Sequence, residues 1–361
     1  MEIIPTTIIG QKEYPAISLL LPTHPAYPKF KIDRGHLQEL VVEAERQVRA
    51  RFSPNLSDKM MGKLSAIIND INYTQLSKGL AIYVSPHHAK VIHLPFEVTE
   101  KVVVDESFEV RDLIYAAQLN NEYLLAMITK NGVRTMFGFG ENIIPVHYKD
   151  MPEGINDVIN SHSLPGWDYL DTEAYDEKNI HNFLRFTDDV LEKELKGNGM
   201  KMIVIGDRKL LGYFKAQTKS ADKIIGYVEG NYEHASNADL KRLIKPLFDL
   251  EQSKAEVKAL TILNGAVNTG HFESGITAVW RAVEEGRGRM LLVEKDYRQV
   301  ARFGDDGMSI LLNHDILPSH YHLSDAVDDL IEKVMLMGGE IKFVQNGSLT
   351  DHQRIALITH Y

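Results

Sequence analysis

Residues 123–137 have the sequence YLLAMITKNGVRTMF, and this stretch decides the fold class of the middle of the chain. Two apolar runs, 123–128 and 133–137, flank Lys130-Asn131-Gly132, and an Asn-Gly pair between such runs predicts a tight β-hairpin. Helical and strand patterns then alternate: a helix near 178–196, a strand at 202–206, a helix at 208–217, a strand at 224–228 and a long helix from 238 to about 260. A hairpin followed by this alternation predicts an α/β layer structure.

The first third of the chain has a different order of elements. The apolar run Ile17 to Leu21 ends at Pro22, which is typical of a buried strand. Apolar residues at three- and four-residue spacing predict helices over about 36–53 and 57–72, with Ser57 as the N-cap of the second helix. We expect residues 53–56, Ser-Pro-Asn-Leu, to form the turn between them. Residues 80–84 and 89–94 flank Pro86-His87-His88 and predict a second hairpin.

The last third predicts a compact α/β/α sandwich, because helices again alternate with short strands. The helices are expected near 275–285 and 323–337, and the strands at 290–293, 341–344 and 355–358. We therefore expect a mixed α/β protein of three consecutive domains, over residues 1–117, 118–258 and 259–361.

Composition excludes several classes of protein. The chain has 361 residues, 44% of them hydrophobic and 25% charged, and it contains no cysteine. Disulfides, catalytic thiolates, iron–sulfur clusters and cysteine zinc sites are thereby excluded. No run approaches the roughly 18 apolar residues that a membrane helix needs, and the N-terminus lacks a signal-peptide pattern, so we expect a cytoplasmic protein without a membrane partner.

Charge is distributed unevenly along the chain. The formal net charge is −10, yet residues 21–90 contain ten Lys/Arg against six Asp/Glu, so only the first third is suited to meet a polyanion. Residues 150–177 contain eight acidic residues and no Lys or Arg. Because Pro152, Gly154, Pro165 and Gly166 interrupt this stretch, we expect residues 150–178 to form a long acidic loop.

Signatures of catalysis are missing from the sequence. It has no Gly-x-Ser-x-Gly elbow, phosphate-binding Gly-x4-Gly-Lys-Ser/Thr loop or His-Glu-x-x-His helix, so we predict no catalytic, cofactor or metal-ligating residues. The basic residues of the first third form either a solvated charged face or a rim that contacts phosphate; they are Lys29, Lys31, Arg34, Lys59 and Lys63. Trp167 in the acidic loop either packs onto its own domain or contacts a partner.

Five segments, in this order along the chain, resemble the bacterial branch of the archaeo-eukaryotic peptide-chain release factor and Pelota superfamily. They are Ser18-Leu-Leu-Leu-Pro-Thr23, Ile203-Val-Ile-Gly206, Gly226-Tyr-Val-Glu-Gly-Asn231, residues 327–344 (VDDLIEKVMLMGGEIKFV) and residues 355–361 (IALITHY). The resemblance implies an N-terminal domain that enters the ribosomal decoding centre, a ribonuclease-H-like middle domain and a C-terminal domain like kink-turn-binding ribosomal proteins.

The sequence departs from the family pattern at both functional motifs. Where release factors carry Gly-Gly-Gln, the corresponding loop here is the acidic stretch, and it contains no such triplet. Where they carry Asn-Ile-Lys-Ser, this chain has Asn55-Leu56-Ser57-Asp58-Lys59. We therefore predict a non-catalytic factor of the ribosomal A site, acting in rescue or silencing. It would contact ribosomal RNA, but not DNA, through the five basic residues above with Asn55 and Ser57, and an elongation-factor-type GTPase is a possible partner.

Two other hypotheses stay open. A hydrolase or nuclease could use the middle domain, but it would need several carboxylates converging on Mg²⁺, and only Asp207 and Glu229 follow predicted strands there. A stress-response interaction protein without RNA contact would agree with the overall acidity.

Overall fold

The computed structural model describes residues 14–24, 30–73, 76–119, 122–139, 142–155, 172–196, 199–312 and 322–361. The chain forms two compact units. Unit 1 combines the two ends of the sequence, residues 1–118 and 255–361, and unit 2 contains residues 119–254. The mixed α/β fold class is confirmed, with several sheets each covered by helices. The three predicted domain boundaries stay a prediction.

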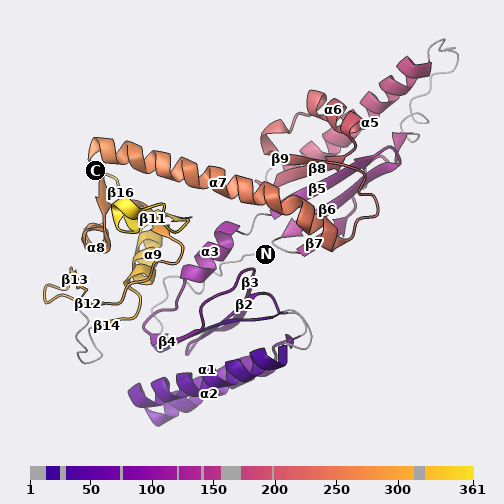
Figure 1. Ribbon diagram of the computed structural model, residues 1–361. Helices are drawn as coiled ribbons and strands as arrows, with labels where there is room; N and C mark the ends of the chain where they lie inside the picture. Colours follow the sequence, from indigo (N-terminus) through magenta and orange to yellow (C-terminus); the bar gives the residue numbers. More distant parts are fainter. Residues whose placement is uncertain are drawn as a thin grey trace. The chain divides into compact units, whose positions relative to one another are not determined.

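The N-terminal part of unit 1 is an antiparallel sheet covered by a helical hairpin (Figure 1). Its strand order is β3-β2-β1-β4, so the predicted first strand is a central one. The strands are β1 (Ala16–Pro22), β2 (Gly79–Val84), β3 (Ala89–Leu94) and β4 (Lys101–Asp105), and the helices are α1 (Phe30–Arg51), α2 (Pro54–Asn69) and α3 (Arg111–Leu119). The predicted hairpin of β2 and β3 is confirmed, whereas β4 and α3 were not predicted.

Strand β1 is buried on both faces because alternate residues enter different cores. Ile17, Leu19 and Leu21 pack with α1 and α2. Ala16 and Leu20 instead join a core that also contains residues of α3 and of the C-terminal part of unit 1. A strand with two apolar faces appears in the sequence as an unbroken apolar run, which is the pattern that predicted it.

The boundary between the two helices differs from the prediction. Helix α2 begins at Pro54, so Asn55 and Leu56 belong to its first turn and only Phe52 and Ser53 connect the helices. Ser53, rather than Ser57, is the N-cap residue, and Ser57 is fully buried inside the helix. The reason is that Pro54 suits the first helical position, where no backbone N–H is needed.

The C-terminal part of unit 1 is the predicted α/β/α sandwich. Its sheet has the order β10-β16-β11-β15, with α7 on one face and α8 and α9 on the other. The elements are α7 (Asn237–Thr269), β10 (Phe272–Ser274), α8 (Ile276–Glu284), β11 (Gly288–Glu294), α9 (Ala326–Leu336), β15 (Glu340–Val344) and β16 (Ile355–Thr359). A small sheet of three strands, which the sequence did not predict, comprises β12 (Ala301–Phe303), β13 (Ile310–Leu311) and β14 (His322–Leu323).

Unit 2 contains a five-stranded sheet of order β7-β6-β5-β8-β9. The first three strands in sequence are antiparallel neighbours, and β8 and β9 run parallel to β5, which is the ribonuclease-H-like arrangement that the resemblance implies. Helices α5 and α6 cover one face, and the start of α7 covers the other. The bounds are β5 (Glu122–Thr129), β6 (Gly132–Phe139), β7 (Asn142–Val146), α5 (Thr172–Leu195), β8 (Lys201–Gly206), α6 (Arg208–Gln217) and β9 (Ile224–Glu229).

The hairpin of β5 and β6 is confirmed, with a small change at its turn. Thr129 pairs with Gly132, so Lys130 and Asn131 form the centre of the turn. The positive φ, 146°, falls on Gly132 itself. A side chain there would also collide with the backbone carbonyl oxygen of Glu153. Glycine is therefore required at this position for two independent reasons.

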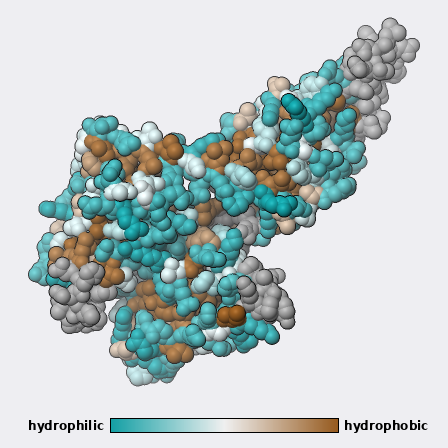
Figure 2. Space-filling model, viewed as in Figure 1, coloured by the Kyte–Doolittle hydropathy of each residue, from teal (hydrophilic) through white to brown (hydrophobic). Residues whose placement is uncertain are grey.

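Hydrophilic residues cover most of the face drawn in Figure 2, and hydrophobic residues appear there in separate patches. None of the helices in the described ranges is long and apolar enough to cross a membrane.

Replacing Gly132 by Ala should destabilise unit 2 by about 1–3 kcal/mol, because Ala meets both the positive φ and the Glu153 carbonyl. Urea unfolding measures this effect. Gly212→Ala is the matched control: Gly212 lies in α6 with open space around its Cα, so Ala should stabilise the helix by up to about 1 kcal/mol. Equal unfolding midpoints for the two variants would contradict the turn geometry described above.

Candidate nucleic-acid interface and a buried charge network

The helical hairpin of α1 and α2 separates the predicted RNA-contacting residues into two groups. Because the helices are joined by two residues and run antiparallel, the start of α1 lies beside the end of α2. Arg34 illustrates this arrangement: its guanidinium lies over the ring of Tyr73, 6.0 Å from the ring centre. At the other end, Arg49 forms an ion pair of 2.9 Å with Asp58. At 1.5 Å per residue, the two ends are roughly 20 Å apart.

The first group is Lys31 and Arg34. Both side chains are exposed on the first two turns of α1, three residues apart and therefore on one side of the helix. Lys29 lies outside the described residues. This end of the hairpin thus presents two neighbouring cations and one aromatic ring.

The second group lies in the first turns of α2. Asn55 and Lys59 are exposed, whereas Ser57 is fully buried and has no surface with which to touch RNA. Asp58 places an acid between them, although Arg49 neutralises it. The second group is therefore more mixed in charge than the first.

Lys63 forms hydrogen bonds within the N-terminal part of unit 1. It is half-buried, and its ammonium group donates hydrogen bonds to the backbone carbonyl oxygens of Ser85 and Pro86 at the turn between β2 and β3. Its position therefore links α2 to this turn, and its donors are not turned outward like those of Lys31.

His24 and Asp33 form a pair that the sequence analysis did not single out. The Asp33 carboxylate is 1% exposed, and His24 is 45% exposed. The backbone N–H of His24 donates to Asp33 Oδ2 at 2.8 Å, and the ring Nδ1 lies 2.7 Å from Asp33 Oδ1. Nine residues separate the two, and no motif in the sequence links them; an acidic residue in the first turn of a helix was the only available signal.

Trp167 and residues 156–171 of the predicted acidic loop lie outside the described residues. Those predictions therefore stay untested. Residues 172–178, which were expected to belong to the same loop, instead form the start of α5.

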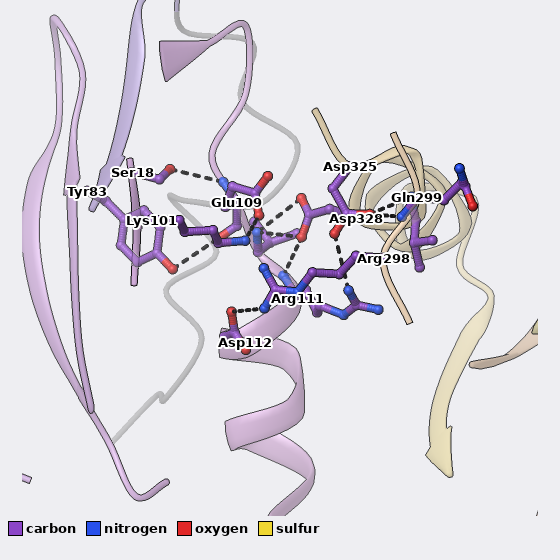
Figure 3. Close-up of polar contacts among 12 residues, drawn as sticks. Ser18, Tyr83, Lys101, Glu109, Arg111, Asp112, Arg298, Gln299, Asp325 and Asp328 are labelled. Carbon is purple, nitrogen blue, oxygen red and sulfur yellow. Dashed lines mark hydrogen bonds and ion pairs between the residues drawn. The ribbon is translucent and has the colours of Figure 1, made fainter. Parts of the chain in front are cut away.

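A buried charge network joins the N-terminal and C-terminal parts of unit 1, and we call it the junction network (Figure 3). Its members are Lys101, Glu109, Arg111, Asp325 and Asp328. Asp328, in the first turn of α9, accepts the backbone N–H groups of Val110 at 3.1 Å and Arg111 at 2.7 Å. These donors belong to the start of α3, where helical N–H groups have no partner within their own helix.

Arg111 makes the reciprocal contact from α3 to α9. Its side chain is 2% exposed, and its Nη1 pairs with Asp325 Oδ2 at 3.1 Å. Its Nη2 donates to the backbone carbonyl oxygen of Tyr297. Asp325 is also the N-cap of α9, because it accepts the N–H of Val327 at 3.1 Å. Asp328 of α9 therefore satisfies the N-terminal end of α3, while Asp325 caps its own helix and accepts the Arg111 guanidinium.

Glu109 extends the network into the N-terminal sheet. Its N–H donates to Ser18 Oγ at 3.0 Å, and its carbonyl oxygen accepts the hydroxyl of Tyr83 at 2.9 Å. Its carboxylate pairs with Lys101 of β4. Glu109, two residues before α3, is thus held by three strands of the sheet.

Three acids at this interface, Glu109, Asp328 and Asp329, have raised pKa values. Burial, followed by the charge of Glu109, raises the pKa of Asp328 well above its ordinary value. Burial also raises the pKa of Glu109, and Lys101 partly opposes this rise. The neighbouring Asp329 has its pKa raised to about 8 by desolvation and by the charges of Asp105 and Glu109, against the lowering effect of Lys333. Asp329 therefore keeps its proton at neutral pH in the folded protein, where an ordinary carboxyl group has released it.

The junction network has a structural role: it holds α3 and α9 together. Asp325, Asp328, Glu109 and Arg111 are buried, and their charged atoms are directed at one another or at backbone groups. Within the described ranges, no group of three or more His, Asp or Glu side chains could hold a metal ion.

The two strand-end acids of unit 2 lie close in the sheet. Gly206 pairs with Glu229 on neighbouring parallel strands, and Asp207 follows directly. The Asp207 carboxylate, however, accepts the N–H groups of Lys209 and Leu210 as the N-cap of α6. It therefore already has a structural role.

Part of the chain matches a known protein family. Residues 122–287 match the sequence model of the bacterial archaeo-eukaryotic release factor family 3, a match that spans the whole sheet of unit 2 and the start of the C-terminal sandwich. This part of the chain is similar to the archaeo-eukaryotic release factors. The resemblance found in the sequence is confirmed over these residues.

Several solved structures are similar to this release factor-like chain over much of its length. The archaeal translation termination factor aRF1 is 13% identical, with 97% of this chain and 94% of that chain covered and a TM-score of 0.24. Pelota from Archaeoglobus fulgidus is 12% identical, with 78% and 79% covered and a TM-score of 0.38. Dom34 from S. cerevisiae is 13% identical, with 79% and 74% covered and a TM-score of 0.40. No curated protein is similar enough in sequence to count as a relative.

Lys63→Met should destabilise the protein by roughly 1 kcal/mol, because the hydrogen bonds to the Ser85 and Pro86 carbonyl oxygens are lost. Lys59→Met, one turn earlier on α2, should change stability by less than about 0.5 kcal/mol because Lys59 is exposed. Thermal unfolding of both variants is the measurement. A Lys59 variant as unstable as the Lys63 variant would contradict the assigned structural role.

Asp329→Asn should stabilise the protein at alkaline but not at acidic pH. The folded-state pKa of Asp329 is about 8 and the ordinary value is 3.8, so the folded protein binds this proton more tightly than the unfolded chain. Stability is therefore lost as the pH rises from about 4 to 8, and Asn removes that loss. We expect a gain of at least about 1 kcal/mol at pH 8.5 and almost none at pH 4.5.

Urea unfolding at the two pH values tests this expectation. Asp351→Asn, at an exposed site of the same unit, is the control and should give the same small effect at both pH values. A gain for Asp329→Asn that does not depend on pH would show that the carboxyl group is not protonated in the folded protein.

Proposed function

We propose that this chain is a non-catalytic, cytoplasmic translation factor that occupies the ribosomal A site, in rescue or silencing of ribosomes. The observation that carries the proposal is the family match over residues 122–287 combined with a sequence that contains no Gly-Gly-Gln triplet anywhere. A superfamily member without that triplet lacks the residues that promote peptide release.

The acidic stretch 150–177 supports this interpretation. It contains eight carboxylates and no Lys or Arg that could neutralise them. Moving such a loop into a pocket walled by RNA phosphate would cost several kcal/mol, by an order-of-magnitude estimate from charge repulsion with screening. We therefore infer that this loop does not enter the peptidyl-transferase centre.

The contact with decoding-centre RNA is assigned to the N-terminal part of unit 1. Lys31 and Arg34 are exposed neighbours on α1, which supports a role in contacting phosphate. Asn55 and Lys59 are exposed at the opposite end of the helical hairpin and would form a second, weaker contact. The positions corresponding to Asn-Ile-Lys-Ser carry Asn55-Leu56-Ser57-Asp58, so we do not assign codon-specific reading to them.

The proposed partners follow from the superfamily. We assign the ribosome as the main partner and an elongation-factor-type GTPase as the protein that would deliver the chain to it. Among similar structures, an archaeal Pelota is described as ribosome-bound and Dom34 as interacting with Hbs1.

A nuclease is less well supported by the geometry. Of the two strand-end acids in unit 2, Asp207 is committed to capping α6. The described residues contain no cluster of three potential metal ligands. We do not assign a hydrolytic reaction.

Co-sedimentation with ribosomes tests the proposal. The wild-type protein should move into the ribosomal fractions of a sucrose gradient, and Lys31→Glu with Arg34→Glu should return it to the top. The reversal replaces two attractive charges by two repulsive ones next to RNA. A wild-type protein that stays at the top in both growing and stressed cells would contradict the proposal and favour an interaction protein without RNA contact.

The control has the same change of net charge at another site. Lys254→Glu with Lys258→Glu reverses two exposed residues one turn apart on α7, and this variant should sediment like the wild type. Circular dichroism of both variants checks that the helices remain folded.

A further inference from the structure

The pair of His24 and Asp33 fixes the orientation of an exposed imidazole. Both oxygens of the buried Asp33 carboxylate are engaged by the same residue, one by the His24 backbone N–H at 2.8 Å and one by the ring Nδ1 at 2.7 Å. A carboxylate can only accept hydrogen bonds, so Nδ1 carries the proton. In the neutral ring, Nε2 is then an acceptor without a hydrogen.

The backbone before His24 is anchored independently of Asp33. The N–H of Thr23 donates to the carbonyl oxygen of Lys78 at 2.8 Å, and Thr23 Oγ1 donates to the carbonyl oxygen of Ser77 at 2.8 Å. His24 is therefore held on one side by the segment that enters β2 and on the other by α1. An exposed side chain that is positioned from two sides loses little conformational freedom when it binds a ligand.

Cationic and aromatic groups lie on the same end of the helical hairpin. Lys31 and Arg34 flank Asp33 on α1 and are exposed, while Asp33 points inward. The Arg34 guanidinium lies over the Tyr73 ring. Single-stranded RNA offers matching groups, because phosphates bind such cations and bases stack on aromatic or guanidinium faces.

We propose that His24 Nε2 accepts a hydrogen bond from a ribose 2′-hydroxyl of single-stranded RNA whose neighbouring phosphates are held by Lys31 and Arg34. The inference rests on the RNA contact assigned under the proposed function, and it adds the residue that would distinguish RNA from DNA. The 2′-hydroxyl is the group that DNA lacks. An acceptor of fixed direction beside two cations is suited to that group, whereas the cations alone bind either nucleic acid.

Binding of the full-length protein to two labelled oligonucleotides of the same mixed sequence, one RNA and one DNA, tests the inference by fluorescence anisotropy. The wild type should bind RNA roughly three- to tenfold more tightly than DNA, as expected for one hydrogen bond. This ratio should stay constant as salt is raised, while both affinities fall.

His24→Asn is the decisive variant. The Asn amide nitrogen can occupy the position of Nδ1 and still donate to Asp33, but the Asn side chain has no atom in the position of Nε2. We expect RNA affinity to fall to that for DNA, with DNA affinity and thermal unfolding unchanged. Lys31→Ala and Arg34→Ala are the matched comparison: each should weaken RNA and DNA binding by the same factor and leave the ratio intact.

Each failure has a separate meaning. Equal binding of RNA and DNA by the wild type overturns this inference and leaves the proposed RNA contact standing. A preference for RNA that survives in His24→Asn also overturns it, as does an equal loss of RNA and DNA binding in that variant. Absence of binding to either oligonucleotide, together with no ribosomal co-sedimentation, overturns the proposed function and this inference with it.

Discussion

The carboxylate of Asp328 at the N-terminal end of α3 is the interaction on which unit 1 depends. It accepts backbone N–H groups from residues 217 and 218 positions away in the chain. Arg111 returns the contact to Asp325 at the start of α9. Two helices whose N-terminal ends face each other would leave backbone donors unpaired in an apolar core, and an unpaired buried donor costs about 1–3 kcal/mol. The junction network satisfies these donors and so permits one shared core.

That shared core explains why the two ends of the chain form one unit. Leu20 and Tyr83 of the N-terminal sheet, Leu113 of α3 and Leu330 of α9 belong to the same buried cluster. The raised pKa values of Glu109 and Asp328 are the physical consequence of placing carboxylates inside it. Burying charge is seldom the most stabilising choice, but it selects one docking arrangement because misaligned helices would leave the charges unpaired. The surface that carries Lys31 and Arg34 is thereby part of a unit built from both ends of the chain.

The sequence analysis predicted the elements whose signals are local. The β5–β6 hairpin, the alternation of helices and strands in unit 2 and the sandwich of α8, α9 and β11 follow from periodicity and turn chemistry within about twenty residues. The elements that it missed are short: they are α3, the strands β4, β7 and β10, and the small sheet of β12, β13 and β14. Helix α3 has nine residues and draws its stability from the core and the junction network rather than from its own pattern. The residues predicted to contact RNA were grouped by sequence, but the antiparallel hairpin places them at two ends, with Ser57 and Lys63 turned inward.

The sequence by itself determined the class of the fold, the resemblance to the release factor superfamily and the absence of the Gly-Gly-Gln triplet, because these depend on residue types and their local spacing. Only the tertiary structure decided which acids are buried and have raised pKa values, which lysines are committed to backbone carbonyl oxygens and that His24 is oriented by Asp33. Those properties depend on contacts between segments far apart in the chain, where hydrogen-bond geometry and the exclusion of water are set by packing and by no local pattern.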